Sequence, residues 1–493
     1  MTAFADRIRG VLNAPGPKGP GPRHDSSDGA PAWLTSALSG EHRTRQEGDE
    51  DLERSLNGQW RHLGDARCFV VEHRRSPAHT HGDEAVGTMA SRLEEGAEAA
   101  PLLGLGVKAP LVFFDLETTG LSGGAGTLAF LIGCGWFDRD RWFVTRQYLL
   151  ARFDDEVPLL AVVASELGRA GALVSFNGKS FDAPLLESRY LYHRVEWAGA
   201  GVPHLDMLHV ARRFWGGGLP SSEAESLRSR PRSSEALPAS GDSLEPRAWG
   251  WGPTPERNST PREAGNCSLI ALERRLLGAR RHGDVPGFEI PSRYFHFLRT
   301  GDARPLRSVF EHNRLDLLSL AGLTSRAVNL VKMGPEHVRH PIEACALGRI
   351  YARAGLDAQA RAAYERAIDL SRSTAAARGF HVEALRALAR AWRRARRNEE
   401  AARCWRQILD IRGCPRHVAC EASEALAIHH EHRVRDLTAA RTFALRSLKQ
   451  DAHGTCDEAV RRRLARLQTK MARTRPEART LEFAELEALS PEP

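Results

Sequence analysis

Three well-separated segments of this 493-residue chain place acidic side chains where metal-dependent chemistry could be built. The first, residues 111–120, reads LVFFDLETTG. Its four apolar residues predict a short buried strand, and because side chains alternate between the two faces of a strand, Asp115 and Glu117 point the same way. Two carboxylates that project together repel each other unless a cation lies between them, and Mg²⁺ or Mn²⁺ prefers oxygen ligands. The alternative is an exposed strand end whose acids simply face water.

The second segment follows another apolar run, residues 172–176, and reads NGKSFD up to Asp182. Ligands gather at the carboxyl ends of strands in α/β sheets, so Asp182 can approach Asp115 and Glu117. An acid in the first turn of a helix, favoured by the helix dipole, explains Asp182 equally well. The same loop offers three polar side chains that could hold substrate or backbone: Asn177, Lys179 and Ser180.

The third segment, residues 309–318, reads VFEHNRLDLL. Its apolar spacing predicts a helix, so His312 and Asp316, which are four residues apart, share one face. An imidazole beside a carboxylate suits metal binding and the abstraction of a proton from water. An ordinary His-Asp pair on a helix surface is the alternative.

Two further motifs have more than one interpretation. Asp206, in the segment HLDML, could be a further acid of the site, a substrate-positioning residue or a helix cap, and the cap is favoured. Residues 124–129, GAGTLA, fit a loose dinucleotide-binding pattern that requires a helix to begin within it. The residues that follow are typical of a strand, so the glycines are interpreted as a turn.

The elements that must position these residues follow one another as strand, strand, strand, helix, strand, helix. Runs 127–137 and 142–150 are joined by Asp-Arg-Asp-Arg, a hairpin signature that predicts an antiparallel meander with the first strand. A helix is expected over 154–168, after which the second acidic segment begins. This order predicts a mixed α/β sheet with flanking helices.

The length and composition of the chain indicate two or three domains. No run of about 18 apolar residues is present and the first ten residues lack a signal-peptide pattern, so a cytoplasmic protein without a membrane segment is expected. A net charge of +8 and a pI near 9.2 are compatible with a polyanionic partner. The predicted divisions are a largely disordered region at 1–57, an α/β domain at 58–333 with a flexible insertion at 216–266, helical repeats at 340–450, and a helical, partly disordered tail at 451–493.

Beyond residue 340 the chain is rich in Ala, Arg, Leu and Glu and resembles a short tetratricopeptide (TPR) array. Small and large residues recur at fixed offsets, and the pattern then repeats around Trp392 and Trp405, which are interpreted as core residues. Basic clusters at 393–397 and 461–463 are either solvated faces or phosphate contacts. The array could bind substrate or a protein partner.

Taken together, the ordered motifs resemble the DEDD exonuclease superfamily and, more closely, bacterial YprB-type exonuclease domains. They are FDLETTG, FNGKSFD, HLDMLH, DVPGFEIP at 284–291 and HNRLDLLSL. The resemblance implies an RNase H-like fold with a mixed five-stranded sheet, in which two Mg²⁺ or Mn²⁺ ions are bound by Asp115, Glu117, Asp182 and Asp316. The predicted substrate contacts are Thr118, Asn177, Lys179 and Ser180. His312, four residues before Asp316, occupies the position of the tyrosine branch and is the candidate general base.

The expected function is therefore a metal-dependent 3′–5′ exonuclease acting on DNA or RNA. Two alternatives stay open at this point. One is a non-catalytic scaffold whose nuclease-like domain binds nucleic acid, and the other is a nucleotide-dependent enzyme that uses the loop at Gly124.

Overall fold

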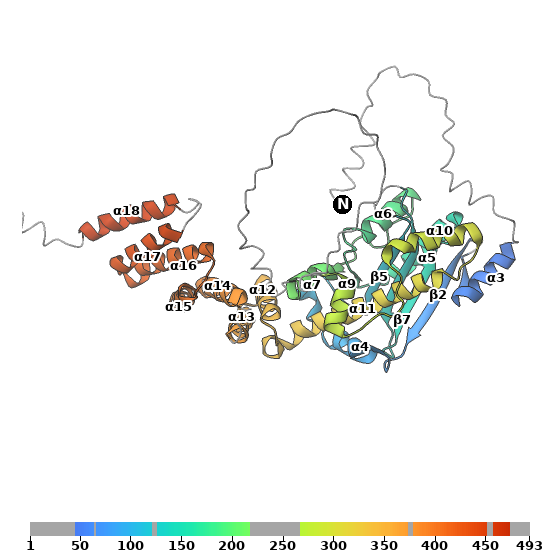
Figure 1. Cartoon of the computed structure of the whole chain (residues 1–493), viewed down its shortest axis with the longest axis horizontal. Helices are drawn as coiled ribbons and strands as arrows, with labels where there is room; N and C mark the ends of the chain where they lie inside the picture. The colour runs from blue at the N-terminus through green and yellow to red at the C-terminus, as the bar shows by residue number, and fades with distance from the viewer. Residues whose placement is uncertain are drawn as a thin grey trace, which may run out of the picture.

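The structure, a computed structural model, describes residues 45–63, 66–120, 126–216, 267–372, 378–450 and 457–473. It has two parts, a mixed sheet flanked by helices and a stack of helices that leads away from it (Figure 1). Several predictions fall outside the described residues: the disordered region over 1–44, the insertion over 217–266, Gly124, and the tail over 474–493.

The central sheet has the strand order β1-β2-β7-β6-β5-β8-β9. Strands β5 (Leu111–Thr118), β6 (Ala129–Phe137) and β7 (Phe143–Leu149) form the predicted antiparallel meander. On the other side of β5, strands β8 (Ala172–Ser175) and β9 (His204–Asp206) run parallel to it. The carboxyl ends of β5, β8 and β9 therefore open at the same edge of the sheet.

The prediction of a five-stranded sheet was wrong, because the sheet has seven strands. The additional pair is β1 (Gln59–Leu63) and β2 (Ala66–Arg75), an antiparallel hairpin that extends the sheet beyond β7. Strand β2 buries Phe69, Val70 and Val71 in a row rather than alternately. A short run buried on both faces carries little periodic signal, and its pairing with β7 involves residues far along the chain. A separate small hairpin is formed by β3 (Thr80–His81) and β4 (Glu84–Ala85).

The first described helix, α3 (Arg45–Leu56), lies within the region 1–57 that was predicted to be largely disordered. It buries Leu52 and Leu56 against the β2 side of the sheet. Asp49 pairs with Arg67 on β2 and with Arg152 after β7. Only two apolar residues face the core, which explains why composition alone suggested disorder.

Helices cover both faces of the sheet. One face packs against α5 (Glu156–Leu167), α6 (Asp182–Tyr192) and α10 (Ile290–Thr300). The other packs against α4 (Val86–Glu95), α7 (Met207–Phe214), α9 (Leu269–Leu272) and most of α11 (Leu306–Met333). Helix α9 continues into a π-helical turn, Glu273–Leu277.

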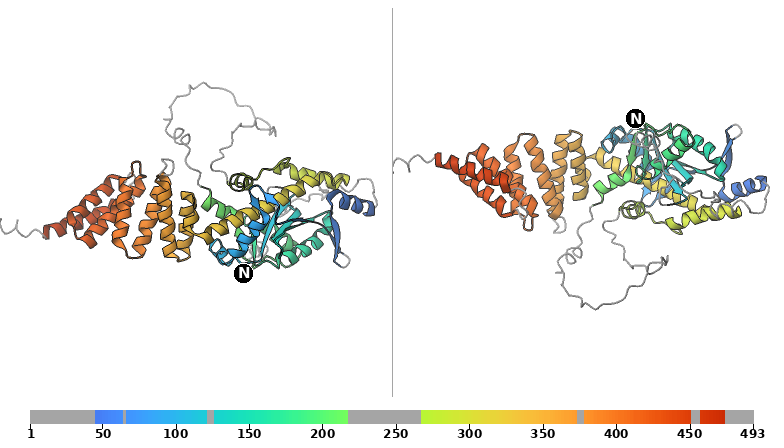
Figure 2. Two further views of the ribbon diagram at one scale, coloured as in Figure 1. Left: turned by 90° about the horizontal axis from the view of Figure 1, so that it is seen from below. Right: turned by 90° about the horizontal axis from the view of Figure 1, so that it is seen from above.

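The second part is a stack in which each helix packs on the next, as the two views in Figure 2 show. Its members are α12 (Pro341–Arg353), α13 (Asp357–Ser371), α14 (Arg378–Arg394), α15 (Asn398–Asp410), α16 (Arg416–His429), α17 (Leu437–Gln450) and α18 (Asp457–Arg473). Close crossing depends on small residues: a Cβ on Gly348 would lie 2.4 Å from the ring of Tyr364. Trp405 is buried and Trp392 is half-buried. No helix in the described part of the chain combines the length and apolar character needed to cross a membrane.

Candidate active site

Strand β5 presents two carboxylates at the edge of the sheet. Phe114 and Leu116 pack into the core on the α5 side, whereas Phe113 packs into the core on the α11 side. Because side chains alternate, Asp115 and Glu117 share the α11 side with Phe113. The pairing of β5 with β6 is irregular between Glu117 and Thr118. Such bulges re-aim side chains and are common next to active sites.

A fully buried asparagine on α11 holds Asp115 in place. Asn313 Nδ2 donates to Asp115 Oδ2 at 2.9 Å, and Asn313 Oδ1 accepts from Gln147 Nε2 at 2.9 Å. A Cβ on Gly133 would lie 2.1 Å from Asn313 Oδ1, so only glycine fits on β6 at this point. Sequence reasoning assigned no role to Asn313, although it lies within the quoted motif HNRLDLLSL and directly after the candidate base.

The loop between β8 and α6 brings Asp182 to the same edge. Asp182 is the first residue of α6, and a Cβ on Gly178 would lie 2.8 Å from Asp182 Oδ2. Asn177 has a positive φ of 67°, which turns the chain sharply after β8. The side chains of Lys179 and Ser180 are exposed, whereas Thr118 donates its hydroxyl to the carbonyl of Gly120 at 2.9 Å.

Asp206 is the helix cap that the sequence favoured, and it also shapes the substrate loop. Its carboxylate accepts from the backbone N–H of Leu208 at 3.0 Å at the start of α7. The same carboxylate accepts from the backbone N–H of Asn177 at 2.8 Å and of Lys179 at 3.2 Å. Asp206 therefore ties the loop that carries Asp182 to the neighbouring strand β9.

The charges of Asp182 and Asp316 act on both acids of β5. Burial raises the pKa of Asp115 well above its usual range, and the charges of Asp316, Glu117 and Asp182 raise it further. The pKa of Glu117 is also raised well above its usual range, first by burial and then by the charges of Asp316 and Asp182. Burial and the nearby Asp206 raise the pKa of Asp182 to about 7. All four residues are half-buried.

Asp316 is held by a buried arginine that sequence reasoning missed. Arg281 Nη2 donates to Asp316 Oδ1 at 2.5 Å, and the guanidinium also pairs with Glu273 at 2.7 Å and with Asp284 at 3.3 Å. Burial raises the pKa of Asp316, and Arg281 and His312 oppose that rise. Arg281 lies just before the quoted motif DVPGFEIP, which was the signal that could have drawn attention to it.

His312 lies between two carboxylates. Its Nδ1 is 2.7 Å from Asp284 Oδ1, and its Nε2 is 3.6 Å from Asp316 Oδ2. Since a carboxylate can only accept, Asp284 holds a proton on Nδ1, and Nε2 is the ring nitrogen that faces Asp316. Asp284 begins the motif DVPGFEIP, but sequence reasoning assigned it no role.

Within the described ranges, no group of three or more His, Cys, Asp or Glu side chains has the geometry of a metal site as it stands. The donor set nevertheless fits a hard divalent cation, because it consists of carboxylate oxygens whose mutual repulsion a cation would relieve. Asp115, Glu117, Asp182 and Asp316 are the residues that would hold such ions.

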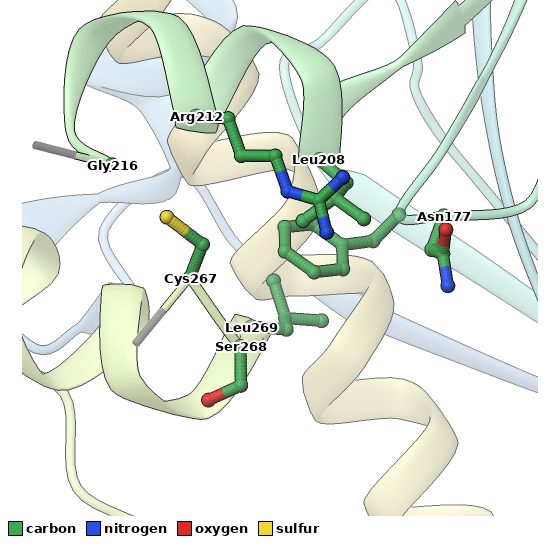
Figure 3. A pocket seen from close by; sticks show the side chains of 8 residues that line it. Asn177, Leu208, Arg212, Gly216, Cys267, Ser268 and Leu269 are labelled. Carbon is green, nitrogen blue, oxygen red and sulfur yellow. The ribbon is translucent and has the colours of Figure 1, made fainter. Parts of the chain in front are cut away.

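A pocket of 580 Å³ opens beside Asn177. Figure 3 shows Arg212 extending from α7 across this pocket, with Cys267 and Leu269 on the opposite wall. Helix α9, which starts at Leu269, leads directly to Glu273 in the arginine network. The residues that line the pocket thus include Asn177 itself and Leu269, which lies four residues before Glu273.

Comparison with known proteins gives one superfamily match and one relative. Residues 112–233 and 255–328 match the model of the RNase H superfamily. An uncharacterized protein, YprB of Bacillus subtilis (strain 168), is 32% identical over 214 residues, which make up 43% of this chain and 40% of that relative. The chain therefore spans less than half the length of this relative. The sheet domain therefore resembles the RNase H superfamily over the matched residues.

Proposed function

We propose that this protein is a metal-dependent 3′–5′ exonuclease that hydrolyses the phosphodiester bonds of nucleic acid. The observation that supports the proposal is a set of four acids at one edge of the sheet: Asp115, Glu117, Asp182 and Asp316. The pKa of each is raised, and the charges of Asp182 and Asp316 contribute to the rise at Asp115 and Glu117. Two bound Mg²⁺ or Mn²⁺ ions would lower the pKa of the attacking water and neutralise charge on the phosphate.

The side chains of the site divide the remaining work. Asp284 orients His312, whose Nε2 takes the proton of the attacking water. Asn313 and Gly133 keep the Asp115 carboxylate in one position, and Asp206 keeps the Asn177 loop folded beside Asp182. Lys179, exposed on that loop, can offer its charge to the phosphate backbone of the substrate.

The direct test is degradation of 5′-labelled oligonucleotides in the presence of Mn²⁺. We expect a ladder that shortens from the 3′ end, and at least a hundredfold loss of rate in Asp115→Asn. Asp140→Asn, an exposed acid in the β6–β7 turn, is the matched control and should retain the wild-type rate. The enzyme proposal fails if wild-type protein leaves single- and double-stranded DNA and RNA intact with both Mg²⁺ and Mn²⁺. A second panel with blocked 3′ or 5′ ends tests the polarity.

One observation favours a second function, a nucleic-acid-binding scaffold that does not cleave. Arg281 and Asn313 already engage Asp316 and Asp115, and this contact pattern could serve stability alone. Fluorescence anisotropy with a labelled oligonucleotide separates the two, since a scaffold would bind tightly and leave the oligonucleotide uncut.

The proposal extends to the helix stack as a TPR-like array that guides substrate or a protein partner. Its support is the Gly348–Tyr364 packing and an exposed basic cluster at 393–397. Replacing Arg393, Arg394, Arg396 and Arg397 with alanine should weaken oligonucleotide binding if the array guides substrate. Unchanged binding would favour a protein partner.

The alternative of a nucleotide-dependent enzyme at the Gly124 loop is not carried forward. Residues Ala129–Phe137 form strand β6, whereas a dinucleotide-binding loop requires a helix at this point.

A further inference from the structure

The most unusual group near the candidate site is a cation rather than an acid. The Arg281 side chain is 4% exposed, and its guanidinium donates to carboxylates from three parts of the chain: Glu273, Asp284 and Asp316. Arginine cannot lose its proton in a protein, so this charge is permanent. It occupies one oxygen of an acid that the proposed function assigns to metal binding.

Arg281 is also anchored by Glu273, which shares Nη2 with Asp316 and in addition accepts from Nε. Glu273, which is 1% exposed, accepts from Arg281 Nε and Nη2, and also from Ser319 Oγ at 2.6 Å. Ser319 in turn lies 2.8 Å from Nε2 of the buried His81. The guanidinium is therefore held by a network that does not include Asp115, Glu117 or Asp182, and it can keep its place on Glu273 when its contact with Asp316 changes.

We infer that Arg281 is a built-in counter-ion that competes with a divalent cation for Asp316 and so sets the metal affinity of the site. The inference rests on the proposed function, because it assumes that Asp316 is a metal ligand. Asp316 Oδ1 is shared between the two cations, and a divalent ion that approaches this oxygen meets the like charge of the guanidinium. Glu273 moderates the competition, because it neutralises part of the arginine's charge.

Two substitutions should therefore change metal affinity in opposite directions. Arg281→Met removes the competing charge, and we expect the dissociation constant for Mn²⁺ to fall about tenfold. Glu273→Gln leaves Arg281 without its main partner and commits it more fully to Asp316, so the dissociation constant should rise about tenfold. A purely structural role predicts that both substitutions disturb the site and weaken binding.

The experiment is direct titration of the full chain, freed of metal by EDTA, with Mn²⁺ followed by electron paramagnetic resonance. Arg314→Met is the matched control, because Arg314 lies two residues before Asp316 on α11 and pairs with Glu311 rather than with the four acids. It should leave the dissociation constant within about twofold of wild type. Thermal melting adds a second readout: Arg281→Met should melt below wild type in EDTA, since it leaves buried carboxylates unpaired, and should regain most of that loss with Mn²⁺.

The possible failures are distinguishable. Wild-type binding of Mn²⁺ that is lost in Asp316→Asn, together with unchanged or weaker binding in folded Arg281→Met, overturns the counter-ion inference and leaves the proposed function standing. Absence of Mn²⁺ binding by wild type, or binding that survives Asp316→Asn unchanged, overturns both. If Arg281→Met does not fold, Arg281→Gln replaces it: tighter binding supports the inference, and equal or weaker binding overturns it.

Discussion

Asn313 connects a glycine on β6 to a carboxylate on β5. Its amide fills the space above Gly133 and donates to Asp115 Oδ2. This arrangement links the packing of two strands against α11 to the position of one acid. A Gly133→Ala substitution, which adds one methyl group, tests this link.

We expect Gly133→Ala to destabilise the protein by about 1–3 kcal/mol, the usual cost of overpacking a tight core. The new methyl group would displace Asn313 and deprive Asp115 of its donor, so nuclease activity should also fall. Urea denaturation measures the stability. Gly126→Ala, where a Cβ meets nothing within 4 Å, is the control and should be nearly neutral. A Gly133→Ala protein as stable as the control would show that α11 does not pack this closely.

The raised pKa of Asp182 predicts that the stability of the folded protein depends on pH. Its pKa in the folded protein is raised to about 7 from an ordinary 3.8, first by burial and then by Asp206. The folded state therefore binds the proton more tightly than the unfolded state, and wild-type stability falls as pH rises from about 4 through 7.

Asp182→Asn removes this ionisation, so it should raise the melting temperature in EDTA by several degrees at pH 8 and by clearly less at pH 5. Differential scanning fluorimetry at the two pH values measures the difference. An equal gain at both would mean that the Asp182 carboxylate is not the ionising group responsible.

Among the elements, α18 is held to the helix stack by one buried carboxylate. Glu431 lies in the π-helical turn His430–Val434, and its fully buried side chain accepts from Arg463, Arg466 and Lys470 of α18. The hydrogen bond from Arg466 is the largest cause that lowers the pKa of Glu431 to about 2. Val460 and Leu467 add a small apolar contact with α17.

Replacing this carboxylate should release the helix. In Glu431→Gln the three cations lose a charged acceptor, and we expect trypsin to cleave within 457–473 at least about tenfold faster, because local opening exposes its Arg and Lys residues. Glu458→Gln, an exposed partner of Arg462 on the same helix, is the control. Cleavage at the control rate would show that apolar packing alone holds α18.

For the molecule as a whole, α11 joins the candidate site to the helix stack. It carries His312, Asn313 and Asp316 near one end, and the carbonyl of Val331 near its other end accepts from the Tyr351 hydroxyl of α12 at 2.7 Å. Trp215 Nε1, after α7, donates to Glu343 Oε1 on α12 at 2.9 Å. The buried core on the α11 side of the sheet continues without a break into α12–α16.

The helix stack should therefore contribute to the thermal stability of the sheet domain. Ending the chain at Gly334 would expose the apolar surface that α12 covers, and we expect the melting temperature to fall by more than about 5 °C. A chain ending at Gln450 keeps the contact between α11 and α12 and is the matched control. If the shorter chain melts at the temperature of the control, the RNase H-like domain is stable without the stack.

Local patterns in the sequence determined the strands β5 to β8, the helix α5 and the capping of α7 by Asp206, because each depends on residues within a few positions of one another. They also marked Asp115, Glu117, Asp182, His312 and Asp316 as candidates. A strand was also indicated by residues 68–72, within β2, but strand β1 and the place of the β1–β2 hairpin in the sheet were missed because they depend on pairing with β7.

The tertiary structure alone decided what surrounds those candidates. Asn313 reaches Asp115 across 198 positions, Ser319 reaches Glu273 across 46, and Arg281 reaches Asp316 across 35. Hydrogen bonds and ion pairs of this kind form between side chains that folding brings together, and they leave no periodic trace in the sequence. Residue type and spacing therefore indicated which acids could bind a metal, and only the fold showed which buried cation contacts one of them.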